Sequence, residues 1–286
     1  MNREDLVKIF HETVNIVSKE PEYISPNGKK QFVPGVGETI TYRDFPKFGF
    51  SGRKYETTEV KVINGDCLEV AKEVVKRGDT CAVLNMASFK RPGGGVLFGS
   101  SSQEESLFRR TNLAMSLYPF SVENFGIIGV EKAIDGVYPL PINGGAIYSK
   151  FITVFRAPES KSCELMDDPF EIDVITIAAI KNPPLSEDGK LSTWVVSVLR
   201  NKVTLMLRLC VLYNIDVPVL GAFGCGAYGT PPEQMAEIFK EVLLSGEFDG
   251  AFKAVLFPII DNHNTHKEHN PNGNFKPFLD ILPKQI

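Results

Sequence analysis

The sequence predicts an α/β fold, a three-layer α/β/α sandwich around a mixed, mostly parallel sheet. From residue 59 onward, short apolar strands alternate with amphipathic helices, and this order is typical of a parallel sheet covered by helices. Hydrophobic residues make up 43% of the 286 residues and charged residues 23%, which is the balance of an ordinary globular protein. Because the chain contains no internal repeat, low-complexity tract or linker, we expect one domain over residues 1–286.

The first 56 residues predict a helix followed by an extended arm. Apolar residues at Leu6, Phe10 and Val14 have the spacing of a surface helix that packs on a core. Residues 20–56 are rich in proline, glycine and aromatic residues, a composition that is typical of an extended segment wrapped around the body of a protein.

The strands and helices of the sandwich follow in order along the chain. Strands are expected over residues 59–64, 80–87, 151–157, 172–179, 216–223 and 252–260. Helices are expected over residues 66–78, from Ser192 or Thr193 to about Tyr213, and from Pro231 to residue 244. Asp66 is a residue type that caps helix N-termini, and the fixed φ of Pro232 suits a first helical turn. Trp194 is expected in the core.

Charge and cysteine content exclude several classes of function. The formal net charge of -4 at pH 7 does not suit broad electrostatic binding of nucleic acid, which requires a basic face. The five cysteines lack CxxC spacing, so we expect reduced thiols and neither a disulfide framework nor a zinc site. No apolar run approaches the roughly 18 residues of a membrane span, and the charged N-terminus has no signal-peptide core. We therefore expect a cytoplasmic protein without membrane or sequence-specific nucleic-acid partners.

Two glycine-rich segments follow strand ends, where ligands bind in sheets of this kind. The first contains Gly93, Gly94 and Gly95, after the strand that ends near Asn85, and the second is GAFGCGAYG, residues 221–229. Glycine permits positive φ and close approach of backbone N–H groups, so such loops can hold a diphosphate without any lysine. A tight turn is the simpler explanation for a single loop. Two such loops at equivalent strand ends favour a binding site.

The motif Gln103, Glu104 and Glu105 opens a helix that Ser101 or Ser102 can cap. Acidic residues in a first turn are favoured by the helix dipole, so a purely structural role is one interpretation. The other is that one carboxyl group faces a bound diphosphate and handles a proton at a glycosidic oxygen. Neighbours on a helix project roughly 100° apart, so the two glutamates cannot share that role equally.

The two motifs together resemble the signature of bacterial-type poly(ADP-ribose) glycohydrolases, a macrodomain-related family. That signature is GGG, a spacer of about six to eight residues, and QEE; here residues 96–102 separate Gly95 from Gln103. The strand VLNMA, the GAFGCGAYG loop and the terminal VLFPIIDNHN followed by NFKPF are also similar to the family. The resemblance covers nearly the whole chain and implies a macrodomain-like fold and a hydrolase that acts on poly(ADP-ribose).

The resemblance also implies a role for each residue of the motifs. Glu105 is the expected catalytic residue, and Glu104 is expected to bind the ribose at the scissile bond. Contacts to the ligand are expected from Asn85, Gly93, Gly94, Gly95, Val96 and Gln103, and from Phe223, Gly224, Cys225, Gly226, Ala227 and Tyr228. The implied reaction is hydrolysis of the O-glycosidic ribose–ribose bond at the end of the polymer, which releases ADP-ribose without a metal ion or cofactor.

Two other functions remain open on these residues. One is a binding module that recognises terminal ADP-ribose without cutting it, and the other is hydrolysis of a different ADP-ribose conjugate, such as a mono-ADP-ribosylated protein. The intact QEE motif with Glu105 favours an enzyme over a reader. In each case the partners are ADP-ribose, poly(ADP-ribose) or ADP-ribosylated proteins, and the sequence leaves open which conjugate is physiological and whether cleavage is purely terminal.

Histidines and arginines near these motifs have simpler explanations. His263, His266 and His269 have HxxHxxH spacing, but asparagine, proline and glycine surround them and no fourth zinc ligand is evident. A solvated loop, which can border the adenosine because it follows a strand end, is the favoured interpretation. Arg109 and Arg110 are expected on a solvated helix face or in a salt bridge.

Overall fold

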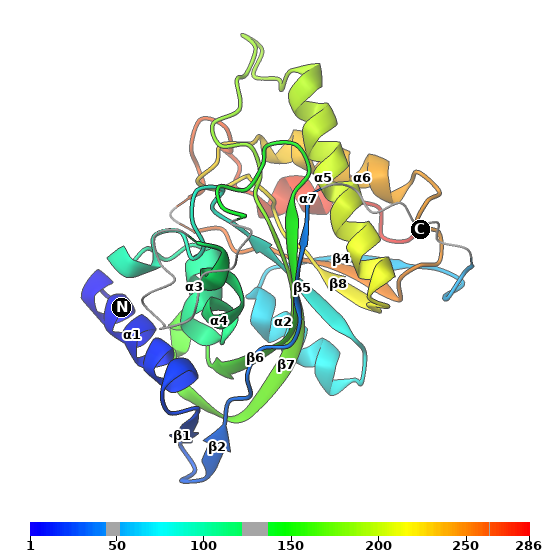
Figure 1. Cartoon of the computed structure of the whole chain (residues 1–286). Coiled ribbons are helices and arrows are strands. Elements are labelled where there is room, and N and C mark those ends of the chain that lie inside the picture. The colour runs from blue at the N-terminus through cyan, green and yellow to red at the C-terminus, as the bar shows by residue number, and fades with distance from the viewer. Residues whose placement is uncertain (44–51, 122–136, 263) are drawn as a thin grey trace. The chain divides into compact units, whose positions relative to one another are not determined.

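The computed structural model describes residues 1–43, 52–121, 137–262 and 264–286. Seven strands form one sheet in the order β3 (Thr39–Tyr42), β6 (Ala146–Arg156), β7 (Leu165–Ile177), β5 (Cys81–Met86), β8 (Val217–Val219), β9 (Ala254–Pro258) and β4 (Glu59–Ile63) (Figure 1). β5 pairs parallel with β8, and β9 pairs parallel with both β8 and β4, whereas β6 and β7 are antiparallel. A mixed, mostly parallel sheet accompanied by helices confirms the predicted α/β fold.

The chain divides into two compact units, each built from separate stretches of sequence. The first unit comprises Met1–Thr41, Asn85–Pro141 and Ile147–Thr176, and the second comprises Tyr42–Leu84, Ile142–Ala146 and Ile177–Ile286. The first unit contains α1 (Arg3–Ser18), α3 (Gln103–Arg110) and α4 (Leu113–Leu117), and the short helices η1 (Val96–Phe98), η2 (Tyr118–Phe120) and η4 (Glu159–Lys161). The second contains α2 (Cys67–Lys76), α5 (Thr193–Leu212), α6 (Pro232–Leu243) and α7 (Phe275–Ile281).

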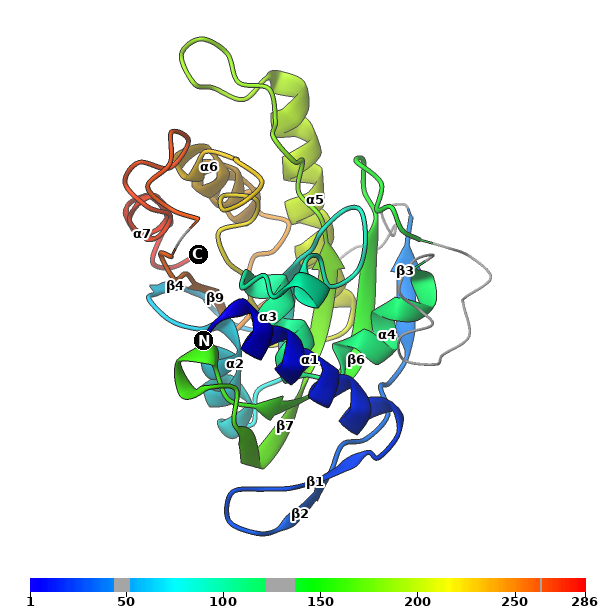
Figure 2. The ribbon, with the colours of Figure 1, turned by 90° about the vertical axis from the view of Figure 1, so that its left-hand side faces the viewer.

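In the first unit, α1 begins with a capping box. Asn2 Oδ1 accepts a hydrogen bond from the Asp5 N–H at 2.9 Å, and the Asp5 carboxylate accepts one from the Asn2 N–H at 3.2 Å. The buried face of the helix, which includes Leu6 and Phe10, packs beside α3 and α4 (Figure 2). The Phe10 ring meets Tyr118 edge to face at 6.4 Å between centroids. The predicted N-terminal helix is therefore confirmed, and it supports the helix that carries the QEE motif.

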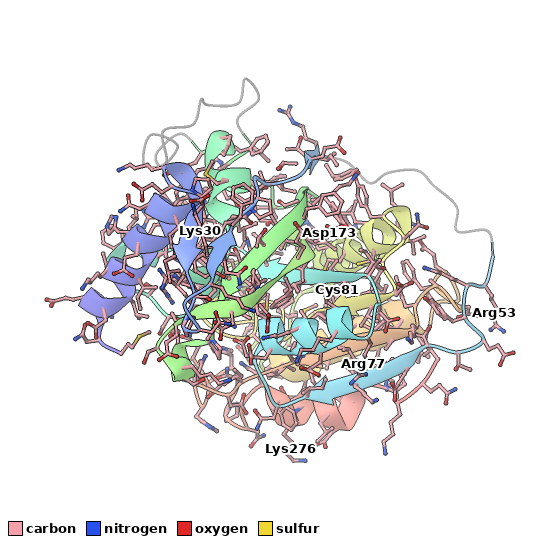
Figure 3. The ribbon with its side chains drawn as sticks, turned by 90° about the horizontal axis from the view of Figure 1, so that it is seen from below. Lys30, Arg53, Arg77, Cys81, Asp173 and Lys276 are labelled. Atoms are coloured by element: carbon pink, nitrogen blue, oxygen red, sulfur yellow. The ribbon has the colours of Figure 1, made fainter. Side chains whose placement is uncertain are left out.

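The segment after α1 contains strands that the sequence analysis did not predict. β1 (Glu22–Ile24) and β2 (Lys30–Phe32) form an antiparallel hairpin, and β3 joins the large sheet. An ion pair joins Lys30, labelled in Figure 3, to Glu22 across the hairpin. Tyr23 is buried, and its hydroxyl donates to the Met166 carbonyl at 2.8 Å. Proline and glycine mark the turns of this segment, and β1 and β2 pair locally, but the neighbour of β3 in the sheet is β6, which lies about 100 residues further along the chain.

In the second unit, the predicted helix starts are confirmed. The Asp66 carboxylate accepts hydrogen bonds from the N–H groups of Leu68 and Glu69, both at 3.0 Å, and so caps α2. Ser192 is the N-cap of α5, and Pro232 is the first residue of α6. α6 packs against both α5 and α7, and α7 also contacts β4. These contacts place the end of β8 and the loop that follows it within the second unit.

One prediction about the core is wrong. Trp194 lies in the first turn of α5, and its side chain is 52% exposed. The buried face of this helix begins one residue later at Val195 and continues through Val198 and Leu199, so Trp194 points off that face. Among the described helices, none is both long enough and apolar enough to cross a lipid bilayer.

Candidate active site

The two glutamates of the QEE motif lie in the first turn of α3, next to the carboxyl end of β5. Ser102 occupies the N-cap position of this helix. Gln103 Oε1 accepts a hydrogen bond from the Met86 N–H at 3.0 Å, which ties the start of the helix to the end of the strand. Glu104 is only 4% exposed and Glu105 only 7%. Both carboxyl groups therefore point into the first unit, although first-turn acidic residues are usually solvated.

The triple-glycine loop is fitted around these carboxyl groups. The Gly93 N–H donates to Glu104 Oε1 at 3.1 Å, and the Gly95 N–H donates to Glu105 Oε1 at 2.8 Å. A Cβ atom on Gly94 would lie 2.6 Å from Glu105 Oε1 and 3.0 Å from Glu104 Oε2. Gly94 also has a φ of 53°, in the left-handed region that favours glycine. Glycine is required here because the backbone passes in direct contact with both carboxyl groups.

Hydrogen-bond donors engage both oxygens of Glu104. Its Oε2 accepts from the Ser88 N–H at 2.7 Å, its Oε1 accepts from Gly93, and the buried Asn85 side chain also bonds to this carboxyl group. Burial and the neighbouring charge of Glu105 raise the pKa of Glu104 to about 8, although the three hydrogen bonds act to lower it. The Glu104 carboxyl group is therefore mostly protonated at neutral pH.

Glu105 differs from its neighbour in having one oxygen without a protein partner. Oε1 accepts from the Gly95 N–H, whereas Oε2 is buried and forms no hydrogen bond with any described residue. Leaving a buried acceptor unpaired costs about 1–3 kcal/mol, so such an atom in a native structure is a sign of a functional role. Of the two carboxyl groups, Glu105 is the one with an oxygen available to a proton or a ligand.

The N–H groups of the triple-glycine loop all have acceptors inside the first unit. Gly93 and Gly95 donate to the two glutamates, and Gly94 donates to the Arg91 carbonyl at 3.3 Å. Val96, also expected at the ligand, is only 1% exposed and packs against Gly93. These amides hold the two carboxyl groups in place and are not free donors for a diphosphate.

The second glycine loop, in the second unit, leaves several backbone donors free. The Gly224 carbonyl accepts from the Thr230 N–H at 3.0 Å and closes the loop. The N–H groups of Gly224, Gly226 and Ala227 form no hydrogen bond within the described part of the chain. The Thr230 hydroxyl is buried and also lacks a partner among the described residues. Backbone N–H groups gathered in one loop form a concave site that attracts anions.

The remaining residues of the second loop pack within their unit. Phe223 is fully buried, and the Cys225 thiol donates to its carbonyl at 3.5 Å. Burial raises the pKa of the Cys225 thiol well above its usual value, so this cysteine is not a nucleophile and fills the loop. The Tyr228 carbonyl accepts from the Asn182 N–H at 2.8 Å, which anchors the far end of the loop.

The histidine-containing loop docks on the second glycine loop and is not merely solvated. His269 Nε2 lies 2.9 Å from the Cys225 carbonyl and 3.2 Å from the Gly226 carbonyl, and the fully buried Asn270 donates to the Cys225 carbonyl at 3.0 Å. His263 lies outside the described residues. Within the described ranges, no three histidine, cysteine or acidic side chains gather where they could hold a metal ion. The polar composition of this loop predicts exposure to solvent, so the sequence alone does not indicate its contact with the second glycine loop.

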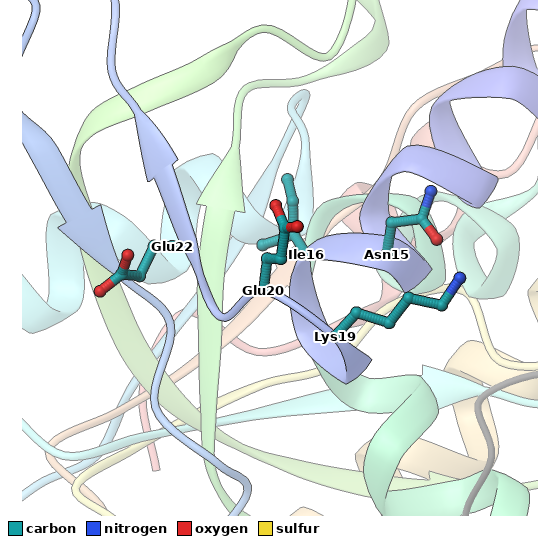
Figure 4. Close-up of a pocket in the computed structure, with 5 residues that line it drawn as sticks. All are labelled: Asn15, Ile16, Lys19, Glu20 and Glu22. Carbon is teal, nitrogen blue, oxygen red and sulfur yellow. The ribbon is translucent and has the colours of Figure 1, made fainter.

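A pocket near the end of α1 is lined by residues other than those of the predicted site. It has a volume of about 250 Å³ and is lined by Asn15, Ile16, Lys19, Glu20 and Glu22 (Figure 4). Two carboxylates and one ammonium group surround it, which does not suit a diphosphate, and no predicted site residue lines it.

The predicted site residues thus form two groups, one in each unit. The first group consists of Asn85, Gly93, Gly94, Gly95, Val96, Gln103, Glu104 and Glu105. The second consists of Phe223, Gly224, Cys225, Gly226, Ala227 and Tyr228. The structure adds Ser88 to the first group and Thr230 to the second. Ser88 acts through its backbone N–H, so no side-chain pattern could have marked it.

Comparison with known protein families identifies the family of this chain. Residues 11–157, just over half of the chain, match the catalytic domain of microbial-type PARG, the poly(ADP-ribose) glycohydrolases. The chain belongs to this family. The predicted family and the predicted enzyme class, a hydrolase of the glycosidase type, are therefore confirmed.

Solved PARG structures resemble the chain over most of its length. PARG from Thermomonospora curvata has a TM-score of 0.76 and 27% identity, and the match covers 98% of this chain and 100% of that one. The same enzyme bound to the inhibitor ADP-HPD has a TM-score of 0.75 and 26% identity, with 97% and 99% covered. PARG from Deinococcus radiodurans in complex with ADP-ribose has a TM-score of 0.61 and 28% identity, with 80% and 85% covered. No curated protein sequence matches.

Proposed function

We propose that this PARG-family protein hydrolyses the O-glycosidic ribose–ribose bond at the end of poly(ADP-ribose) and releases ADP-ribose. Family membership supports the reaction class, and the structural relatives bound to ADP-ribose and to ADP-HPD support the ligand class. The observation that carries the proposal is the buried Glu105 carboxyl group, with one oxygen fixed by Gly95 and the other without a partner among the described residues.

Glu105 is the proposed acid and base. Its carboxyl group gives a proton to the oxygen of the leaving ribose as the glycosidic C–O bond breaks, and the bonding electron pair stays on that oxygen. Water then attacks the oxocarbenium-like sugar and loses a proton to the Glu105 carboxylate. The residue ends in the protonation state in which it began, and each step uses only this carboxyl group, water and the substrate.

Glu104 is proposed to bind the ribose at the scissile bond. Its raised pKa, about 8, means that Glu104 retains its proton at neutral pH, when an isolated glutamate would be ionised, so it can donate a hydrogen bond to a ribose oxygen. The Ser88 and Gly93 amides hold Glu104 in position for this role.

The second glycine loop is proposed to hold the diphosphate of the terminal ADP-ribose. The free N–H groups of Gly224, Gly226 and Ala227 supply donors without requiring a lysine or arginine. The buried Thr230 hydroxyl adds one more donor at the base of the loop. Phe223 is proposed to pack under the distal ribose. A loop of this kind suits the negative net charge of the chain, because its attraction for anions is local.

The proposal extends to the setting of the reaction. We place the enzyme in the cytoplasm because all five cysteines are free thiols, the state that a reducing compartment maintains. Its partners are poly(ADP-ribose) or ADP-ribosylated proteins, with no membrane and no sequence-specific nucleic acid. We also propose that residues 1–286 act as one catalytic domain with the helix and arm of residues 1–56 packed on it, supported by the 98% coverage of the chain by the T. curvata match.

The test compares wild-type protein with Glu105→Gln, Glu104→Gln and the control Glu171→Gln, which changes an exposed glutamate of β7 in the same unit. Each protein is incubated with poly(ADP-ribose) and, separately, with a mono-ADP-ribosylated protein, and released ADP-ribose is quantified. We expect release from the polymer by wild type and control, and a loss of about 10³-fold in Glu105→Gln, because a proton donor of this kind contributes roughly that much.

Binding of free ADP-ribose, measured by calorimetry, separates the other functions. We expect Glu105→Gln to bind ADP-ribose as wild type does, since the change removes a proton and not a contact of the diphosphate. A wild-type protein that binds ADP-ribose but releases none from either substrate would be a reader. Release only from the mono-ADP-ribosylated protein would assign the other conjugate as substrate.

A further inference from the structure

The loop of residues 261, 262 and 264–274, here called the C-terminal loop, forms hydrogen bonds with carbonyl groups of the second glycine loop. His269 Nε2 lies within hydrogen-bond distance of the Cys225 and Gly226 carbonyls, at 2.9 and 3.2 Å. Asn270 Nδ2 donates to the Cys225 carbonyl at 3.0 Å. Carbonyl oxygens only accept hydrogen bonds, so His269 carries its proton on Nε2.

These hydrogen bonds to the carbonyl groups fix the direction of the N–H groups on the same peptide units. A trans peptide points its C=O and its N–H in opposite directions. The Cys225 carbonyl shares a peptide unit with the Gly226 N–H, and the Gly226 carbonyl shares one with the Ala227 N–H. The Cys225 carbonyl faces His269 and Asn270, and the Gly226 carbonyl faces His269 and also accepts from the Gly229 N–H at 3.3 Å. Both N–H groups of these peptide units therefore point to the opposite side of the loop. These are two of the three N–H groups that have no acceptor among the described residues.

We propose that His269 and Asn270 are positioning residues that orient the backbone of the second glycine loop for an anion. The inference rests on the proposed function, in which this loop holds the diphosphate. A glycine-rich backbone samples many conformations, and a single peptide flip would turn a carbonyl dipole toward the phosphates in place of an N–H. Hydrogen bonds from His269 and Asn270 exclude the flipped peptide conformation in the free protein. The entropic cost of ordering the loop on binding is therefore lower.

Asn270 is itself fixed by hydrogen bonds within the C-terminal loop. Asn270 is fully buried, and its Nδ2 also lies 2.9 Å from the Asn264 carbonyl and 2.9 Å from Asn274 Oδ1. Its Oδ1 accepts from the Lys267 N–H at 2.9 Å. The Asn274 N–H in turn donates to Asp261 Oδ1 at 2.7 Å. Hydrogen bonds within the loop therefore hold the Asn270 donor in a defined position, next to His269 in the chain.

The test uses the full-length protein and two changes at His269. His269→Phe keeps an aromatic ring and removes the donor, whereas His269→Gln places an amide N–H near the position of Nε2. We expect His269→Phe to weaken binding of ADP-ribose about tenfold and to raise KM for poly(ADP-ribose) similarly, with kcat within about twofold, because one hydrogen bond to the loop is lost. We expect His269→Gln to restore most of the affinity. His11→Phe makes the same change at an exposed histidine of α1 and serves as control.

Asn270→Asp is a second variant with the same size and no amide donor, and we expect a larger loss because a carboxylate then faces the Cys225 carbonyl. Wild-type affinity in His269→Phe, with or without a lower Tm, would overturn the inference and leave the histidine a merely structural role. Equal losses in His269→Phe and His269→Gln would also overturn it, because the donor would then be irrelevant. Failure of the wild-type protein to bind ADP-ribose would instead overturn the proposed function.

Discussion

The two glycine-rich loops both follow strands of the sheet, but they use their backbones in opposite ways. In the first loop, the N–H groups of Gly93 and Gly95 bind the glutamates of the protein itself. In the second, the carbonyls of Cys225 and Gly226 are bound by the protein, and N–H groups remain free. Glycine thus allows close approach of the protein's own carboxyl groups in the first loop, and in the second loop it is proposed to allow close approach of a ligand. The residue pattern alone does not distinguish these uses.

Among the substitutions that test this comparison, Gly94→Ala is expected to have the largest effect on activity. A Cβ there would lie 2.6 Å from Glu105 Oε1, and the φ of 53° is strained for alanine. We expect Gly94→Ala to lower kcat on poly(ADP-ribose) about 100-fold, because a misplaced catalytic group loses roughly that factor, while Kd for ADP-ribose changes less than about threefold. Kinetics and calorimetry on the same preparation measure the two effects.

The matched control is Gly28→Ala in the β1–β2 turn. Gly28 has a φ of 81°, so the backbone strain is comparable, but nothing lies within 4 Å of the added Cβ. We expect wild-type turnover in this variant. An equal loss of kcat in both variants would mean that backbone strain, and not displacement of Glu105, explains the Gly94 result.

A smaller effect, on binding instead of turnover, is expected at Gly224. A Cβ there would lie 2.7 Å from Thr230 Oγ1 and 2.9 Å from the Ala179 Cβ, which forces the loop to shift. We expect Gly224→Ala to raise Kd for ADP-ribose about tenfold with little change in kcat. Gly246→Ala in the same unit is the matched control, because its φ of 82° gives comparable backbone strain and nothing lies within 4 Å of the added Cβ. A kcat loss larger than the Kd change in Gly224→Ala would contradict a purely binding role.

The smallest expected effect is a pH dependence of the free energy of unfolding, which arises from Glu104 beside the first loop. The pKa of Glu104 is raised from 4.5 to about 8, so between these values the folded protein holds a proton that the unfolded chain releases. This contribution to stability is fully present below pH 4.5 and is lost as pH rises through 8. We expect Tm to fall by several degrees more between pH 6 and pH 9 in wild type than in Glu104→Gln. Parallel Tm curves would contradict the raised pKa.

Features with local causes could be predicted from the sequence. The starts of α2, α5 and α6 follow from Asp66, Ser192 and Pro232, because a cap or a fixed φ acts within one helical turn. The GGG and QEE motifs could be placed beside each other because both adjoin the end of one strand. The order of alternating strands and helices likewise predicted the fold class.

Features that depend on distant partners could not be predicted. Arg109 and Arg110 were expected on a solvated face or in a salt bridge, and the salt bridge of Arg109 with Glu159 exists. Both side chains are nevertheless buried, at 0% and 1% exposure, so the solvated face is wrong. The acceptors that allow this burial include the Ser100 and Arg156 carbonyls, and the second of these lies far along the chain. The direction of each loop amide depends in the same way on tertiary contacts.

The burial of charge along α3 has a consequence for how the protein folds. Of the six buried residues in this eight-residue helix, four are Glu104, Glu105, Arg109 and Arg110. So short a helix is unstable in isolation, and apolar burial gives this one little driving force. Its stability comes from partners such as the Gly95 amide, the Ser100 carbonyl and Glu159, which reach their places only when the surrounding chain has assembled. The helix that carries the QEE motif is thus the element whose formation depends on the assembly of the rest of the first unit.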